Sequence, residues 1–247
     1  MPGKTRLLID AGNTRIKWTL VDEQSVVDKV ENDAELASVI SAWKMLAKPD
    51  QVWVASVRDK PFDLELSSEI SSLWALPTNE VISVKHALGV TNAYPEPETL
   101  GCDRWAAMIA AYAERQSSML IVSVGTALTI DAIDATGYHL GGLICPGIHL
   151  QQKALDSGTN INSFPDIEAN EEIKLFSNST AQGVASGTIH AISALINKAY
   201  QELIKLDSNA ICYLTGGDAE KIKDTLQCPY VLQKSLVLKG MAVITAE

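Results

Sequence analysis

Two short stretches of this chain combine a buried-strand pattern, a polar residue and a glycine turn that leads into a second strand. Residues 8–14 carry Gly12 at the turn, and residues 121–126 carry Gly125. Main-chain N–H groups can hold a phosphate only where no Cβ intervenes, so glycine belongs at the tip of such a turn. Two turns of this kind predict a clamp for the phosphates of a nucleotide.

The elements expected after each glycine exclude two common phosphate-binding folds. The sequence returns to strand character in residues 16–21 and again in residues 128–133. A P-loop or dinucleotide fold instead runs from strand through glycine loop to helix, and its glycine spacings are missing here. The pattern therefore predicts strand, hairpin and strand in both places.

Asp10 ends the first apolar strand. A carboxylate there is expensive to bury unless it meets a cation or strong donors, and Mg²⁺ carried on ATP phosphates would supply that cation. Asp10 could instead only cap the turn, but Gly12, Asn13 and Thr14 accompany it and favour a functional role. Lys17 on the outgoing strand is either placed to reach a phosphate or an ordinary lysine that faces solvent.

A second group of polar residues, Gly101 to Arg104, opens a strongly apolar helix directly after a loop that contains two prolines. An acid at a helix start is common as a cap, and Asp103 could be no more than that. An arginine beside it works against the helix dipole. Arg104 is therefore better explained by an anion that lies outside the helix.

Length and charge limit the classes of protein to which the chain can belong. At 247 residues with 47% hydrophobic content it can build one large domain or two of about 120 residues. Asp10 and Ser123 are 113 residues apart, close to half the chain, which predicts two halves, 1–117 and 118–247, with a cleft between them.

With 30 acidic against 20 basic residues, the net charge of −10 disfavours a nucleic-acid partner. The chain shows no run of about 18 apolar residues and no apolar leader, so we expect no membrane partner and a cytoplasmic location. The four cysteines lack CxxC spacing, which favours buried free thiols over a metal site.

Hydrophobic periodicity predicts strands early in each half and helices later, which indicates a mixed α/β sheet in each. In the long helix expected from Thr180, Gly183 and Gly187 indicate either tight helix packing or the approach of a ligand. The polar segment 156–172 is predicted to be a loop. Strands are expected at 6–9, 16–21, 51–56, 81–84, 118–123, 128–133, 139–144, 210–214 and 230–232, and helices at 34–46, 64–76, 103–115, 149–156, 180–206, 218–226 and 236–246.

Several blocks, taken together and in their order along nearly the whole chain, resemble the type III pantothenate kinases. Any one of them is weak, and the set is specific. The blocks are Asp10-x-Gly12-Asn13-Thr14-x-x-Lys17, Gly101-x-Asp103-Arg104, Gly125-Thr126-Ala127-x-Thr129, His139-Leu140-Gly141-Gly142-x-Ile144-x-Pro146-Gly147, Ser179-Thr180 and Leu214-Thr215-Gly216-Gly217-Asp218.

The resemblance implies an α/β fold of duplicated ribonuclease-H-like halves, as in the actin-like ATPases, with mixed sheets flanked by helices and ATP in the central cleft. It implies a homodimer whose active site is completed at the interface. The implied reaction transfers the γ-phosphoryl group of ATP to the terminal hydroxyl of pantothenate, giving 4′-phosphopantothenate, the first step towards coenzyme A.

The resemblance also assigns residues to roles, with Asp103 as the general base. Gly216 and Gly217 would lie near the adenosine, or would form only a tight turn with Asp218 as cap. The ATP site, with Mg²⁺ at Asp10, would comprise Asp10, Ala11, Gly12, Asn13, Thr14, Arg15, Ile16, Lys17 and Thr126, and the pantothenate pocket would comprise Tyr94, Gly101, Cys102, Asp103, Arg104 and Thr180.

The chain departs from the family at Ser123, where aspartate is usual and a monovalent cation, K⁺ or NH₄⁺, is bound. Serine offers a neutral oxygen, so this site is either weakened or built from other groups. Two alternatives stay open at this point. One is a non-catalytic accessory protein that binds a nucleotide or acyl ligand, and the other is a kinase or phosphatase of the same superfamily that acts on another small molecule.

Overall fold

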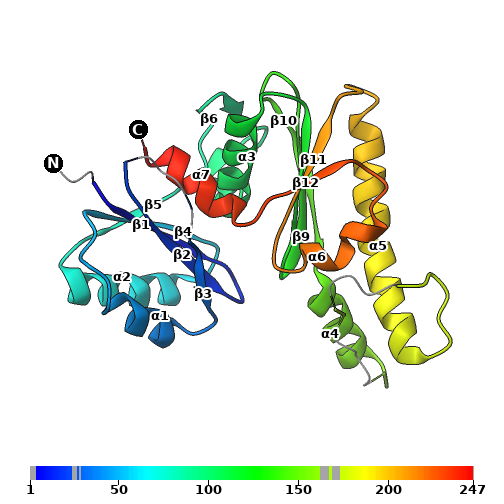
Figure 1. The fold of residues 1–247 in the computed structure, drawn as a ribbon, viewed down its shortest axis with the longest axis horizontal. Helices are drawn as coiled ribbons and strands as arrows, with labels where there is room; N and C mark the ends of the chain where they lie inside the picture. The colour runs from blue at the N-terminus through cyan, green and yellow to red at the C-terminus, as the bar shows by residue number, and fades with distance from the viewer. Residues whose placement is uncertain (1–3, 24–26, 28, 162–166, 169–172, 247) are drawn as a thin grey trace. The chain divides into compact units, whose positions relative to one another are not determined.

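The computed structural model describes residues 4–23, 27, 29–161, 167–168 and 173–246. The chain divides into two compact units, residues 116–234 and residues 1–115 together with 235–247. The sequence places 118–247 in a single second half, whereas helix α7 (Leu236–Ile244) packs against α3 (Cys102–Glu114) in the first unit (Figure 1). The apolar face of a helix does not specify which sheet it covers, so the sequence pattern could not place α7.

The first unit is built on a five-stranded mixed sheet in the order β3-β2-β1-β4-β5. Strand β2 is antiparallel to both β1 and β3, and β4 and β5 continue parallel to β1. The strands are β1 (Arg6–Ala11), β2 (Ile16–Val21), β3 (Glu31–Asp33), β4 (Gln51–Ser56) and β5 (Thr78–Glu80).

Helices cover both faces of this sheet, so every residue of β1 is buried. Alternate side chains of a strand point to opposite faces. Leu7 and Ile9 accordingly pack against α1 (Leu36–Trp43) and α2 (Lys60–Trp74), and Leu8 packs on the face covered by α3 and α7. Asp10 at the end of β1 is thereby carried into the protein interior.

The α3–α7 contact depends on a glycine. A Cβ on Gly240 would lie 1.8 Å from the carbonyl oxygen of Ala106, so only glycine lets the two backbones approach this closely. The C-terminal helix is therefore fitted to α3, which carries Asp103 in its first turn.

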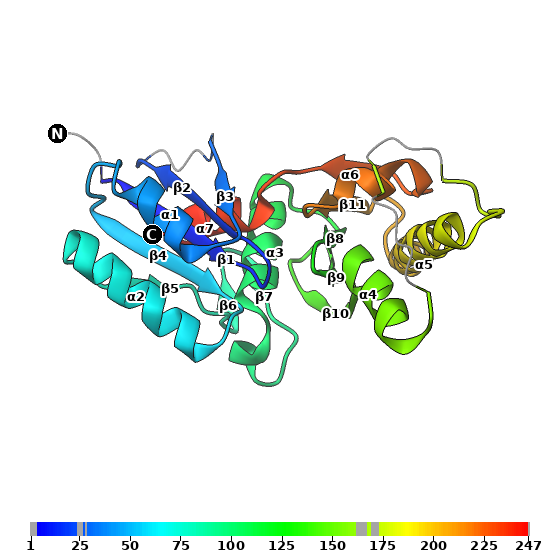
Figure 2. The same ribbon diagram turned by 90° about the horizontal axis from the view of Figure 1, so that it is seen from below.

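The second unit repeats the sheet of the first, in the order β10-β9-β8-β11-β12 and with the same strand directions. Figure 2 shows α4 (Ile148–Gly158) and α5 (Thr180–Leu203) on one side of this sheet. The other elements are β8 (Met119–Val124), β9 (Ala127–Ile133), β10 (His139–Pro146), β11 (Ile211–Thr215), α6 (Ala219–Ile222), the 3-10 turn η2 (Lys223–Thr225) and β12 (Tyr230–Leu232).

This duplication makes the two hairpins equivalent. Asp10 lies opposite Lys17 across the β1–β2 pair, and Ser123 lies opposite Thr129 across the β8–β9 pair. The strand, hairpin, strand order predicted for both stretches is confirmed.

Some predicted elements differ from those observed. The strand predicted at 81–84 is wrong, because the paired residues are the polar ones of β5 just before it. Helix α2 begins at Lys60 instead of Leu64, because Asp59 caps it by accepting the Phe62 N–H at 3.2 Å. The short elements β3, β6 (His86–Ala87), β7 (Val90–Thr91) and η1 (Pro97–Thr99) have too few residues to produce a periodic pattern.

Two further expectations meet the structure only in part. Helix α4 extends to Gly158, and residues 162–166 and 169–172 of the predicted loop lie outside the described residues. All four cysteines are free, but Cys102 and Cys145 are half-buried, and only Cys212 and Cys228 are fully buried. No helix in the described part of the chain combines the length and the apolar character needed to cross a membrane.

Candidate active site

The first hairpin turns tightly between Ala11 and Ile16. A Cβ on Gly12 would lie 3.2 Å from the carbonyl oxygen of Arg15, which is tighter than ordinary packing. This close approach favours glycine, and it is the reason for glycine here because the Gly12 backbone is not in the left-handed region. The hairpin therefore keeps open backbone at its tip, as a phosphate-binding turn requires.

The Asp10 carboxyl group is 7% exposed, and its environment disfavours the charged form. Burial raises the pKa of Asp10 to about 6, the positive charge of Lys17 opposes this increase, and the negative charge of Asp103 adds to it. Asp10, Lys17 and Asp103 therefore lie in one electrostatic neighbourhood. No hydrogen bond or ion pair to the Asp10 side chain is found within the described residues. A bound cation would relieve this cost.

The first turn of α3 is arranged around Asp103. Gly101 occupies the N-cap position without a side-chain cap, and the Oδ1 of Asp103 accepts the N–H of Arg104 at 2.8 Å. A Cβ on Gly101 would lie 2.7 Å from that Oδ1, so glycine leaves room for the carboxylate. Asp103 does accept a backbone N–H, as the capping alternative expects, but it lies inside the helix and its charge also acts on Asp10.

The Cys102 side chain is half-buried and is affected by the charges of both Asp103 and Asp10. Its Sγ donates to the carbonyl oxygen of Ser56 at 3.3 Å. Burial, followed by the charges of Asp103 and Asp10, raises the pKa of Cys102 to about 12. The thiol is therefore protonated at neutral pH, and a nucleophilic role is excluded because the thiolate is the reactive form.

Arg104 and Tyr94, both expected in the pantothenate pocket, are in contact. The Arg104 guanidinium donates to the Tyr94 hydroxyl at 3.1 Å and lies 5.8 Å from the ring centroid. Arg104 is 7% exposed, which is rare for a charged side chain. A buried cation of this kind is suited to binding a carboxylate.

Sequence reasoning missed Asn92, which shapes the loop that carries Tyr94. Asn92 is fully buried, its Oδ1 accepts the Tyr94 N–H at 2.9 Å, and its Nδ2 donates to the Pro97 carbonyl at 3.1 Å. Lys85 donates to the Asn92 carbonyl at 2.7 Å. Asn92 lies between Thr91 and Ala93 in a loop, and no sequence feature there indicated this role.

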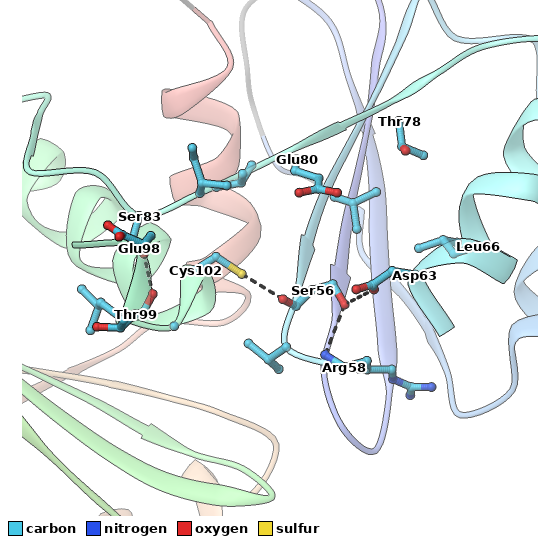
Figure 3. Close-up of a pocket in the computed structure, with 16 residues that line it drawn as sticks. Ser56, Arg58, Asp63, Leu66, Thr78, Glu80, Ser83, Glu98, Thr99 and Cys102 are labelled. Carbon is cyan, nitrogen blue, oxygen red and sulfur yellow. Dashed lines mark hydrogen bonds between the residues drawn. The ribbon is translucent and has the colours of Figure 1, made fainter. Parts of the chain in front are cut away.

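A cavity of about 410 Å³ lies beside Gly101 and Cys102 at the carboxyl ends of β4 and β5. Figure 3 shows the Ser56 hydroxyl between Asp63 and Arg58. The hydroxyl donates to the Asp63 carboxylate at 2.5 Å and accepts the backbone N–H of Arg58 at 3.2 Å. The cavity is lined by both polar and apolar side chains and opens next to the proposed pantothenate residues of α3.

In the second unit, two glycines support the second hairpin. A Cβ on Gly147 would lie 2.0 Å from the carbonyl oxygen of Gly125, and the Gly147 N–H donates to the Thr126 carbonyl at 3.0 Å. Gly216 has a φ of +105°, and its Cβ would lie 2.2 Å from the Val124 carbonyl oxygen. Gly216 thus forms a tight strand-to-helix turn, which is one of the two interpretations that the sequence left open for it.

Asp218, the residue after this turn, does not act as a side-chain cap. It occupies the N-cap position of α6 but makes no side-chain cap hydrogen bond. Its carboxylate lies 3.0 Å from the Lys221 ammonium and 3.8 Å from the Nε2 of His149. The capping alternative for Asp218 is therefore wrong for its side chain.

The departure at Ser123 is accompanied by two neighbouring hydroxyl groups. Ser123 lies opposite Thr129 on β9 and opposite Thr215 on β11. Residues directly opposite one another in a sheet present side chains on the same face. Three neutral oxygens are thus placed side by side at the end of β8, where the first unit has the charged pair Asp10 and Lys17.

Thr180 is exposed at the first turn of α5, after Ser179, whose Oγ accepts the Gln182 N–H at 3.3 Å. It borders a groove of about 620 Å³ between α4 and α5 that also contains Gly183 and Gly187. No described residue comes within 4 Å of a Cβ on either glycine, so tight helix packing inside this chain does not explain them.

The structure thus distributes the predicted site residues between the two units. The first unit holds the Asp10–Lys17 hairpin together with Tyr94 and the segment 101–104, and Asp10, Lys17 and Asp103 are brought together there. The second unit holds Ser123, Thr126 and Thr180.

Comparison with known proteins identifies the family. Residues 6–202 match the family model described as type III pantothenate kinase. The chain belongs to the type III pantothenate kinase family. Curated members include one from Nitrosospira multiformis, 32% identical over 98% of this chain and 91% of its own length, and one from Burkholderia mallei, 35% identical over 96% and 98%.

Solved structures agree on the fold. A Campylobacter jejuni protein described as a conserved putative Baf family transcriptional activator matches with a TM-score of 0.60 at 21% identity, covering 96% of both chains. A Listeria monocytogenes protein described as a putative N-acetylmannosamine kinase matches with a TM-score of 0.53 at 13% identity, covering 97% of both chains. The predicted duplicated α/β fold of the actin-like ATPase and sugar kinase class is confirmed.

The raised pKa of Asp10 predicts a pH-dependent gain in stability for Asp10→Asn without ligands. Because the folded-state pKa of about 6 exceeds the ordinary value of 3.8, wild-type folding loses stability as pH rises from about 4 through 6. The variant lacks this loss, so its free energy of unfolding relative to wild type should increase by up to about 3 kcal/mol between pH 4 and pH 8. Urea unfolding at both pH values measures the change, and a constant difference would contradict the assignment.

Proposed function

We propose that this member of the family transfers the γ-phosphoryl group of ATP to the terminal hydroxyl of pantothenate, giving 4′-phosphopantothenate, with Asp103 as the general base. Family membership over residues 6–202 supports the reaction and its place in coenzyme A synthesis. The observation that supports the site assignment is that the negative charge of Asp103 acts on the buried Asp10, as is expected of a base that works beside the proposed phosphate hairpin.

The first hairpin provides the groups that an ATP triphosphate needs. Main-chain N–H groups around Gly12 would donate to phosphate oxygens, and Lys17 would add a positive charge on the same face as Asp10. The buried Asp10 carboxylate, which lacks a hydrogen-bond partner within the described residues, fits an Mg²⁺ ion carried on the nucleotide. Bound there, Mg²⁺ would neutralise the charge on the phosphates. Thr126 in the second unit stays a predicted member of the ATP site.

Arg104 and Asp103 would handle the acceptor. Arg104, held against Tyr94, would pair with the pantothenate carboxylate and so orient the molecule. Asp103 would take the proton of the terminal hydroxyl while that oxygen bonds to the γ-phosphorus and the bond from phosphorus to the bridging oxygen of ADP breaks. Most of the acceleration in such a transfer comes from alignment and charge neutralisation.

Wild-type protein and Asp103→Asn test this assignment. The variant should lose a factor of about 10² to 10⁴ in kcat, because it cannot accept the alcohol proton, while its affinity for a nonhydrolysable ATP analogue stays unchanged. ATP turnover with pantothenate measures the rate, and calorimetry measures binding. Glu69→Gln, an exposed change on α2, should retain full activity.

Normal turnover by Asp103→Asn would remove Asp103 from the mechanism. Wild-type protein that binds pantothenate and nucleotide tightly without forming product would favour the accessory-protein alternative. A sugar or acetate that outcompetes pantothenate would identify a different substrate.

We propose further that the monovalent cation site of the family is replaced here by neutral oxygens. Ser123, Thr129 and Thr215 lie side by side on three strands and offer hydroxyl groups without a carboxylate. Such a set binds K⁺ more weakly than a set with a full negative charge, because the coulombic attraction is lost.

The rate should therefore depend only weakly on K⁺. Initial rates in potassium and in sodium buffers of equal ionic strength should differ by less than about twofold, whereas Ser123→Asp should restore a clear preference for K⁺ through its added charge. A wild-type rate that disappears without K⁺ would contradict the proposal.

Exposed apolar side chains at the β10 edge of the second unit support a homodimer that includes this edge. Leu143 and Ile144 on the edge strand β10 are 44% and 63% exposed, and Leu150 on α4 is 40% exposed. An edge strand with exposed apolar side chains is a site for association unless it is covered. A second copy of the chain would cover this edge and complete the site near Thr180. The cytoplasmic location expected from the sequence stays a prediction.

Ile144→Asp tests the dimer. A charge placed in an apolar interface is costly, so the variant should sediment as a monomer and lose most of its activity while its circular dichroism spectrum is unchanged. Leu206→Asp, a matched change at a side chain that is 73% exposed after α5, should stay dimeric and active. Equal masses for Ile144→Asp and wild type would exclude this interface.

A further inference from the structure

The tip of the first hairpin is held by an arginine that lies outside the sequence blocks that resemble the family. Arg58 lies in the connection between β4 and α2, and its Nε donates to the Gly12 carbonyl oxygen at 2.7 Å. We propose that Arg58 is a positioning residue that orients the phosphate-binding peptide of the hairpin. This inference rests on the proposed ATP site.

The peptide between Gly12 and Asn13 explains why this bond matters. A trans peptide is planar, so its C=O and its N–H point in opposite directions. Because the Gly12 carbonyl is tied to Arg58, the Asn13 N–H is turned away from Arg58, and no described residue accepts it. The fixed peptide therefore presents an N–H donor for an anion.

The glycine at this position makes such a tie necessary. Glycine is conformationally permissive, so the peptide that follows Gly12 could rotate and present its carbonyl oxygen instead of the N–H. A carbonyl oxygen would repel a phosphate. Arg58 supplies the rigidity that the absence of a Cβ at Gly12 removes.

Arg58 is itself anchored by local contacts. Its guanidinium carbon lies 4.2 Å from the centroid of the Phe62 ring, and its backbone N–H donates to the Ser56 Oγ at 3.2 Å. Ser56 in turn donates to Asp63 on α2, as Figure 3 shows. The first turn of α2 and the end of β4 thus fix the arginine from both sides of the connection.

The guanidinium also retains donors. Only its Nε has an acceptor within the described residues, so the terminal N–H groups stay available near the hairpin. A positive charge at this point adds to that of Lys17 and favours bound phosphate over the empty site. The bond to Gly12 and this charge both act on ATP rather than on pantothenate.

The test is a comparison of Michaelis constants in Arg58→Met and Arg58→Lys. Methionine keeps an apolar stem over Phe62 but cannot donate, so the KM for ATP should rise about tenfold, as expected for a lost hydrogen bond from a charged donor. The KM for pantothenate and the melting temperature should change little. Lysine can donate to the Gly12 carbonyl and should return the KM for ATP to within about threefold of wild type.

Lys60→Ala is the matched control, because Lys60 is a neighbouring exposed cation that forms no hydrogen bond or ion pair within the described residues. It should leave the KM for ATP unchanged, and a rise equal to that of Arg58→Met would show a general charge effect and overturn the proposal. A parallel rise of both Michaelis constants in Arg58→Met, together with a lower melting temperature, would show a merely structural role and would also overturn it.

Lys17→Met separates this inference from the proposed function. If Lys17→Met raises the KM for ATP and Arg58→Met does not, the ATP site stands and the role of Arg58 is refuted. If Lys17→Met leaves the KM for ATP unchanged, the hairpin is not the ATP site and the proposed function fails at that point.

Discussion

The cost of burying one carboxylate organises the first unit. Helices on both faces of the sheet bury every residue of β1, so the strand carries Asp10 out of water and raises its pKa to about 6. Lys17 lowers that cost only in part, and Asp103 increases it. A cation that arrives with the phosphates would lower the cost of burying the charged Asp10 carboxylate. This cost is the physical basis for proposing that the nucleotide binds at the hairpin.

The second unit repeats the architecture without the charge. Ser123 lies where the first unit has Asp10, and Thr129 and Thr215 stand beside it on neighbouring strands. The supports of the two hairpins differ as well. Arg58 holds the first turn through a hydrogen bond, whereas Gly147 and Gly216 support the second through close backbone approach. One duplicated fold therefore carries a charged pair, Asp10 and Lys17, at the hairpin of one half and neutral hydroxyl groups at the hairpin of the other.

Periodic patterns predicted the long elements well and failed where strands are short or polar. The strand predicted at 81–84 has an apolar pattern, yet pairing occurs in β5, whose residues Thr78–Glu80 are all polar. Asp59 moves the start of α2 ahead of its apolar periodicity, because capping acts outside the periodic segment. For α7, the periodicity indicated a helix but not its partner, and the fit of Gly240 against α3 decided that it joins the first unit.

The sequence by itself determined which chemistry is present: glycine turns after buried strands, an acid beside an arginine at a helix start, and a serine in the second half where the first half has Asp10. These are local properties that residue types and spacing express directly. Only the tertiary structure decided that Asp103 acts on Asp10, that Arg104 meets Tyr94, and that Arg58 reaches Gly12 across 46 residues. Such contacts depend on how distant segments pack against one another. The spacing of residues along the chain does not specify that packing.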